Sequence, residues 1–356
     1  MKTWNNVTIT EDDLREDGET LMLQYFNWVI VFVLTPMIAV LGVMGNLTSV
    51  TVLIKLGLRK SSDILLVALA VSDISYMIGA NSPAKLIYQW GRMEGFAFSE
   101  GVSRVCFFIY HLFDILDWGG GHASVGLPVF ITFDRLIAVF FPLKFKLIVT
   151  RHRTLAAVLL FYAYSYGIQI YIRFWYTFTY TSSDEYNVTI GLIDRSELFW
   201  SQQAASKVIE DIYAASLAPL IAVSLGCLVI GIKLKLTALQ RAKMTRRAKK
   251  GKSLHGKQAH SSSHRTTKTL LSVCGFYCIT CVFISLPSML PKDSFFPLFL
   301  FSSAPSQAAV IVYNVLQLIL CVNATSNFVI YVVMNRNFRK TFLTLLKVKQ
   351  SGQQEL

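Results

Sequence analysis

The sequence predicts an all-α membrane protein: a seven-transmembrane helix bundle followed by a short amphipathic eighth helix. Three observations predict this fold: a shortage of charge, five long uncharged stretches, and two further apolar stretches that contain isolated acids. Of the 356 residues, 53% are hydrophobic and only 15% are charged, whereas a soluble chain carries about 25% charged residues. The uncharged stretches cover residues 20–54, 154–172, 212–232, 269–291 and 294–335.

Each of these stretches is long enough to cross a bilayer, because about 20 apolar residues span its hydrocarbon core. The two further stretches are 64–88, which contains Asp73, and 105–139, which contains Asp114, Asp117 and Asp134. Backbone amides inside lipid must find hydrogen bonds within the protein, so only helices or a closed barrel are possible. The runs lack strict alternation, so we expect helices at about 27–54, 64–88, 105–139, 154–174, 206–238, 266–290 and 304–334.

The chain divides into an N-terminal tail (1–26), the transmembrane bundle (27–334) and a C-terminal segment (335–356). In the last segment, Phe338, Phe342, Leu345 and Leu346 share one helical face, opposite a basic face. This pattern predicts a helix lying in the membrane surface. A frayed basic tail is the alternative.

Positive charge predicts the orientation. Four alternate connections, at 55–60, 135–153, 233–268 and 336–349, hold 25 of the 34 lysines and arginines. Basic flanks stay in the cytoplasm, so we expect a plasma-membrane protein with its N-terminus outside and its C-terminus inside. Nucleic-acid binding is the rival explanation of the net charge of +13. Orientation and attraction to anionic lipid explain the clusters more simply, so we expect no nucleic-acid partner.

Two glycosylation sequons agree with this topology. They begin at Asn6 and Asn187, both on the predicted outer side. A third sequon begins at Asn46 inside the first predicted helix, where no sugar is expected. No cleaved signal peptide is predicted, because the acidic start and the long apolar run that follows do not fit one.

Polar residues at bilayer depth are costly and usually mark function, and here they form a recognisable series, one set to a helix. The series comprises Gly45-Asn46, Leu69-Ala70-Val71-Ser72-Asp73, Asp134-Arg135, Pro142-Leu143, Pro219, Pro287 and Asn327-Phe328-Val329-Ile330-Tyr331. Together these motifs resemble the rhodopsin-like (class A) G-protein-coupled receptors across almost the whole chain. Parts of helix seven and the stretch after Pro142 look like invertebrate neuropeptide (FMRFamide-like) and molluscan chemosensory receptors.

The resemblance implies a receptor that transmits an extracellular signal to a heterotrimeric G protein. Arg135 then lies at the inner end of the third helix, held by Asp134 until the sixth helix moves and a partner helix meets the arginine. Pro142, Asn327 and Tyr331 belong to the same coupling switch. A snorkelling interface arginine is the alternative reading of Arg135.

The resemblance also implies a buried sodium and water pocket. Asp73 supplies the carboxylate, because hard oxygen ligands around one acid suit a small cation, and burial disfavours its charged form. We hypothesise that Asp73 takes up a proton or loses a structural Na⁺ on activation; a hydrogen-bonded packing node is the alternative. The pocket residues are Asn46, Asp73, Ser124, Asn323 and Asn327.

Four residues are candidates for ligand binding: Asp117, Asp114, Ser285 and Met289. Asp117 stands where amine receptors of the family hold a ligand ammonium, but the usual aromatic cluster on the sixth helix is absent. Asp117 could equally pair with Arg173 or Lys85. Retinal is excluded, because no lysine occurs between 293 and 339 to form a Schiff base.

The chain departs from the family at several positions. Cys106 lies near the usual outer disulfide, yet no cysteine occurs between it and Cys227, so we expect a free or intermolecular thiol and a loop held by other contacts. Ser285, Cys281 and Phe328 replace residues of the usual switch.

We therefore expect a receptor for a peptide or a chemosensory molecule. An amine receptor using Asp117 and a seven-helix channel or transporter are the alternatives. No hydrolase or metal constellation is visible, because the 6 histidines do not cluster with acids at ligand spacing, so an enzyme is not expected.

Overall fold

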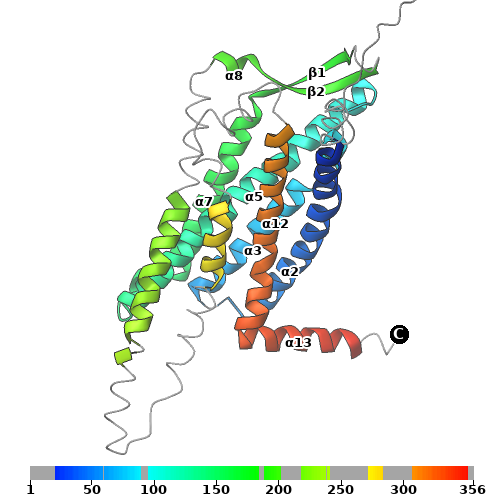
Figure 1. Cartoon of the computed structure of the whole chain (residues 1–356). Helices are drawn as coiled ribbons and strands as arrows, with labels where there is room; N and C mark the ends of the chain where they lie inside the picture. Colours follow the sequence, from blue (N-terminus) through cyan, green and yellow to red (C-terminus); the bar gives the residue numbers. More distant parts are fainter. Residues whose placement is uncertain are drawn as a thin grey trace, which may run out of the picture.

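The chain forms a helical bundle with a small sheet at one end and, at the other end, a last helix that lies roughly perpendicular to the bundle, as the computed structural model shows (Figure 1). The structure describes residues 21–58, 60–89, 95–183, 188–201, 218–237, 239–240, 272–283 and 307–351.

Six described helices are long and apolar enough to cross a membrane: Leu21–Lys55, Ser61–Gln89, Glu100–Phe140, Arg151–Arg173, Ala218–Thr237 and Val310–Met334. A shorter apolar helix, Ser272–Phe283, lies inside the stretch predicted as the sixth crossing. Each of the seven predicted crossings therefore contains a described helix, and the predicted seven-helix bundle is confirmed.

The first crossing contains η1 (Ile30–Leu34), a π-helical segment, followed by α2 (Thr35–Lys55). The third and fourth crossings are α5 (Glu100–Phe140) and α7 (Arg151–Arg173), with the short α6 (Phe145–Ile148) between them. The seventh crossing is α12 (Gln307–Met334).

The second crossing is interrupted, which the sequence-based bounds of 64–88 did not anticipate. α3 (Ser61–Ala80) ends three residues before Pro83, and α4 (Pro83–Gln89) continues beyond the break. Proline has no amide hydrogen to donate, so the helical ladder cannot pass through it. Asn81 Nδ2 donates instead to the Met77 carbonyl at 2.9 Å, and the Ser82 hydroxyl accepts from the Lys85 amide at 3.3 Å.

Glycines let α3 and α5 touch backbone to backbone. A Cβ at Gly79 would lie 2.2 Å from the backbone nitrogen of Asp117, and one at Gly120 would lie 2.6 Å from that of Tyr76. No side chain larger than hydrogen fits at such contacts. The two helices that carry the predicted acids are thus held at the closest possible spacing.

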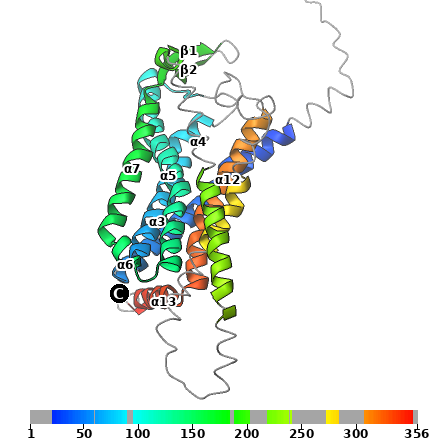
Figure 2. The ribbon, with the colours of Figure 1, turned by 90° about the vertical axis from the view of Figure 1, so that its left-hand side faces the viewer.

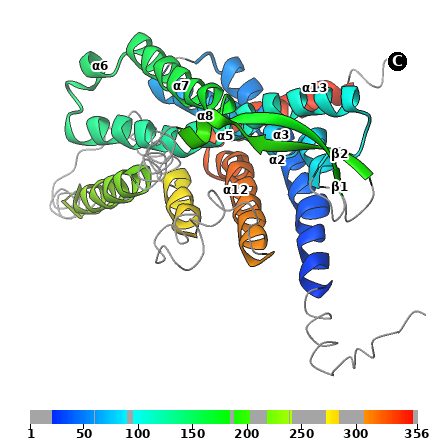
Figure 3. The ribbon, with the colours of Figure 1, turned by 90° about the horizontal axis from the view of Figure 1, so that it is seen from above.

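The end of the bundle that the sequence predicts to face outside, called the outer end below, is capped by an antiparallel hairpin of β1 (Tyr176–Ser183) and β2 (Val188–Arg195), followed by the short α8 (Glu197–Ser201). Its register runs from Tyr176 opposite Arg195 to Ser183 opposite Val188. Seen from above, the strands lie across the outer end of α5 (Figure 3). No strand was predicted here.

At the opposite end, called the inner end below, α13 (Arg336–Ser351) follows α12 after a sharp turn and runs sideways past the end of α2 (Figures 1 and 2). Phe338 is buried, and its ring lies 5.8 Å from that of Tyr331 on α12. Phe342 packs on Phe328, with ring centroids 5.6 Å apart. The first two residues of the apolar face predicted for this segment, Phe338 and Phe342, therefore pack against α12.

Candidate functional site

The inner end of α5 carries the predicted acid–arginine pair. Arg135 donates from its guanidinium to the Asp134 carboxylate, and both side chains are buried. The other carboxylate oxygen accepts a 2.7 Å hydrogen bond from the hydroxyl of Ser61, the first residue of α3. The sequence reasoning missed Ser61. Pro142 is exposed just beyond the end of α5.

The inner half of α12 supplies the next switch residue. Tyr331 is 2% exposed, and within the described residues its hydroxyl has no hydrogen-bond partner. A buried hydroxyl without a partner is unfavourable. Tyr331 thus has an unused polar group close to the turn into α13.

The middle of the bundle contains a three-helix hydrogen-bonded node. Ser124 on α5 donates to one oxygen of Asp73 on α3 at 2.5 Å, and Asn327 on α12 donates to the other at 2.8 Å. Asp73 and its two donors are all buried. Three of the five predicted pocket residues are therefore in direct contact.

The other two predicted pocket residues have different partners. Asn46 donates from its amide to the carbonyls of Gly42 and Ala324, at 3.1 and 3.0 Å. Its amide oxygen is buried and has no partner among the described residues. Asn323 accepts a 2.9 Å hydrogen bond from Thr280 in the sixth crossing. The node thus connects to helices one and six through α12, not through Asp73 itself.

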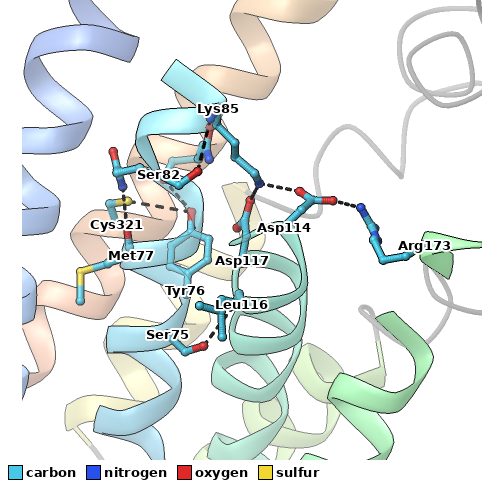
Figure 4. Close-up of polar contacts among 12 residues, drawn as sticks. Ser75, Tyr76, Met77, Ser82, Lys85, Asp114, Leu116, Asp117, Arg173 and Cys321 are labelled. Atoms are coloured by element: carbon cyan, nitrogen blue, oxygen red, sulfur yellow. Dashed lines mark hydrogen bonds and ion pairs between the residues drawn. The ribbon is translucent and has the colours of Figure 1, made fainter. Parts of the chain in front are cut away.

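The outer end contains a row of four charges, drawn in Figure 4, of which three are buried and one, Arg173, is half-buried. Lys85 on α4 contacts the carboxylates of both Asp114 and Asp117 on α5. Asp114 uses its second oxygen to accept from the guanidinium of Arg173 on α7. Of the two partners left open for Asp117, Lys85 is the one found, and Arg173 binds Asp114 instead. We call these four residues the ion-pair row.

Aromatic rings surround the ion-pair row. The ammonium of Lys85 lies 5.7 Å from the ring centre of Tyr110, and the guanidinium carbon of Arg173 lies 5.2 Å from that of Tyr176. His111 lies between these two rings, with centroids 5.6 Å from each. It is 8% exposed, and neither ring nitrogen has a partner among the described residues.

The hairpin is attached to α5 by hydrogen bonds through Phe96, near the position where the sequence resemblance implies a disulfide. Phe96 and Gly191 exchange two backbone hydrogen bonds, of 2.8 and 3.0 Å. The buried hydroxyl of Ser103 lies within 3.1 Å of the Phe96 carbonyl and donates to it. Cys106 is a free thiol. The expectation that other contacts hold this loop is confirmed.

Four predicted site residues lie outside the described residues. They are the ligand candidates Ser285 and Met289 and the sequon asparagines Asn6 and Asn187. The third sequon residue, Asn46, is fully buried, as expected for a position without sugar.

The three clusters lie in order along α5. The outer acids come first, Ser124 lies near the middle, and Arg135 is close to the inner end. Each cluster also contacts the second crossing, through Lys85, Asp73 and Ser61 respectively. Displacement of α5 relative to this crossing therefore changes all three clusters.

Comparison with known proteins agrees with this geometry. The family described as 7 transmembrane receptor (rhodopsin family) matches the chain over residues 45–331, which includes all three clusters. No curated protein matched the chain.

Proposed function

Because this chain belongs to the rhodopsin family of seven-transmembrane receptors and acts as a G-protein-coupled receptor, we propose which of its residues carry the signal. The observation that carries the proposal is the arrangement of three polar clusters along α5. The outer cluster receives the ligand, the Asp73 node transmits the change, and Arg135 meets the G protein.

At the inner end, the Asp134–Arg135 pair restrains the inactive receptor. Both groups are buried, and removing one partner of a buried pair costs about 3–5 kcal/mol, so the pair opens only when the arginine finds another partner. The Ser61 hydroxyl adds a hydrogen bond to the same carboxylate. Helix movement on activation withdraws Arg135 from Asp134 and presents it to the G protein.

The middle node is proposed as the coupling element. The Asp73 carboxylate and the Ser124 hydroxyl form the hard-oxygen part of a sodium site, and Asn327 ties it to α12. Bound Na⁺ would neutralise the buried carboxylate. Asn46 and Asn323 act on the node from a distance, because each is hydrogen-bonded elsewhere.

At the outer end, a peptide or a chemosensory molecule is the proposed ligand, with the hairpin end of the bundle facing outside the plasma membrane. The amine-receptor alternative needs a free Asp117, whereas Lys85 is bound to that carboxylate. A channel or transporter would need a continuous polar path, and nothing in the family match favours one.

The test is a screen of peptide and waterborne-odorant libraries on cells expressing the chain, with G-protein activation as the readout. Arg135→Ala is the inactive control, because it keeps the outer end intact while removing the group proposed to meet the G protein. A ligand that produces equal signals in the wild type and in Arg135→Ala would contradict the proposed role of Arg135. A ligand-gated current without G-protein activation would favour the channel alternative.

A further inference from the structure

The ion-pair row contains two positive and two negative groups in alternation: Asp117, Lys85, Asp114 and Arg173. None of the four side chains is more than 13% exposed. Within the described residues, Asp117 has Lys85 as its ion-pair partner, while Lys85 also has Asp114. The row is therefore electrically balanced and largely screened from water.

This charge balance limits which ligands can bind at the ion-pair row. A simple ammonium compound that took Asp117 would leave Lys85 sharing Asp114 with Arg173, which adds one uncompensated positive charge. A simple carboxylate that took Lys85 would leave Asp117 unpaired and add one negative charge. Uncompensated buried charge costs about 3–5 kcal/mol, which corresponds to an affinity loss on the order of 100-fold or more.

A ligand with both charges avoids this cost. Its ammonium group can take Asp117 while its carboxylate takes Lys85, so one buried contact is exchanged for two. Lys85 keeps Asp114, and the pair between Asp114 and Arg173 remains unbroken. Every charge then still has an opposite neighbour.

A second feature beside the row also points to a polar ligand. His111 is 8% exposed and has two ring nitrogens without partners among the described residues. It lies between Tyr110, which faces Lys85, and Tyr176, which faces Arg173. Buried polar groups are normally hydrogen-bonded, so this imidazole offers a donor and an acceptor to a group bound at the row.

We propose that the ion-pair row is a binding site for a zwitterion, an amino acid or a very short peptide that presents its ammonium and its carboxylate group together. This inference rests on the proposed function, because it names the chemical class of the ligand that the receptor binds. It differs from the amine-receptor reading, in which Asp117 alone binds a cation.

The test measures binding to the purified full-length receptor in lipid nanodiscs by the rise in its melting temperature. The probes are glycine and glycylglycine as zwitterions, ethylamine as a cation and propionate as an anion, all at equal ionic strength. In the wild type, a zwitterion raises the melting temperature and the single-charge probes do not. Ethylamine or propionate acting as strongly as the zwitterions would overturn the proposal.

Two variants test the charge balance without knowledge of the natural ligand. Lys85→Gln leaves Asp117 unpaired, so ethylamine is expected to bind on the order of 100-fold more tightly than to the wild type. Asp117→Asn leaves the row with one surplus positive charge at Lys85, so propionate is expected to bind more tightly to this variant than to the wild type. The double variant Lys85→Gln/Asp117→Asn restores a net charge of zero in the row, so neither ethylamine nor propionate is expected to bind more tightly than to the wild type.

Arg104→Gln is the matched control, because Arg104 forms an exposed ion pair with Glu100 on the same helix. It is expected to leave the preference for every probe unchanged. If the single variants fold and neither binds its single-charge probe more tightly than the wild type does, the zwitterion proposal is wrong. Ligand-free nucleotide exchange on a G protein, measured with the same preparations, separates this result from a failure of the receptor assignment.

Discussion

The hydroxyl of Ser61 donates a 2.7 Å hydrogen bond to Asp134, the residue whose carboxylate holds Arg135. The acid is thus bound at the same time by its own helix and by the first turn of α3. This contact orients the carboxylate toward the arginine and connects the switch to the neighbouring helix. Removal of the hydroxyl should therefore weaken the inactive state without touching either charged group.

Ser61→Ala is expected to raise ligand-free nucleotide exchange by about 10-fold or more, because a hydrogen bond to a charged group contributes about 1.5–3 kcal/mol and 1.4 kcal/mol corresponds to a factor of ten. The measurement is G-protein nucleotide exchange at equal receptor number. Ser62→Ala is the matched control, since the neighbouring hydroxyl is buried but has no partner among the described residues. Equal basal activity in the two variants would show that Ser61 does not steady the switch.

Asp73→Asn is expected to change both basal and ligand-driven signalling, because the variant removes the charge on which the Ser124 and Asn327 hydrogen bonds converge. Sodium chloride should raise the melting temperature of the wild type, and this rise should disappear in the variant. Potassium chloride at the same ionic strength is the control. Signalling that is unchanged in the variant would leave Asp73 as a packing node without a switching role.

Much of the helical bundle was predictable because lipid permits so few structures. A long uncharged run without strict alternation can satisfy its backbone hydrogen bonds inside hydrocarbon only by forming a transmembrane helix. The contacts of Asp134 with Arg135 and of Asp73 with Ser124 were predictable for a related reason. Buried polar groups require partners, and few polar groups exist at each depth.

Other features depend on three-dimensional details that spacing does not encode. Asn323 accepts a hydrogen bond from Thr280, whereas Asn327 donates to Asp73, because the two asparagines share a face of α12 but lie one turn apart along it. Ser61 looks like an ordinary residue at the start of a helix. The hairpin has a sequence signal of its own, since Tyr176, Phe178 and Tyr180 alternate with threonines, and aromatic and β-branched residues in such a run favour a strand.

Gly191→Val is expected to loosen the outer hairpin. A Cβ at Gly191 would lie 2.8 Å from the side chains of both Phe178 and Ser103, and Gly191 also exchanges backbone hydrogen bonds with Phe96. Faster amide hydrogen exchange over residues 188–195 is the expected result. Gly101→Val is the control, because nothing lies within 4 Å of its added Cβ. Unchanged exchange in Gly191→Val would mean that the hairpin does not depend on this contact.

Gly79→Ala should destabilise the receptor, because the added methyl group meets the backbone of α5 and not a side chain that can rotate away. Its Cβ would lie 2.2 Å from the amide nitrogen of Asp117 and 2.6 Å from the Phe113 carbonyl oxygen. Overpacking of this kind costs about 1–3 kcal/mol, so a fall in melting temperature is expected.

Gly167→Ala on α7 is the matched control for that substitution. Nothing lies within 4 Å of its added Cβ, and alanine in a helix is more stable than glycine by about 0.5–1 kcal/mol, so its melting temperature should stay equal or rise.

The Gly79→Ala variant also tests the ion-pair row, because Asp117 belongs to that row. Separation of α3 from α5 moves Asp117 away from Lys85, and Gly79→Ala should then bind ethylamine more tightly than the wild type. A destabilised variant whose probe preference is unchanged would show that the helix spacing stabilises the fold without setting the geometry of the row.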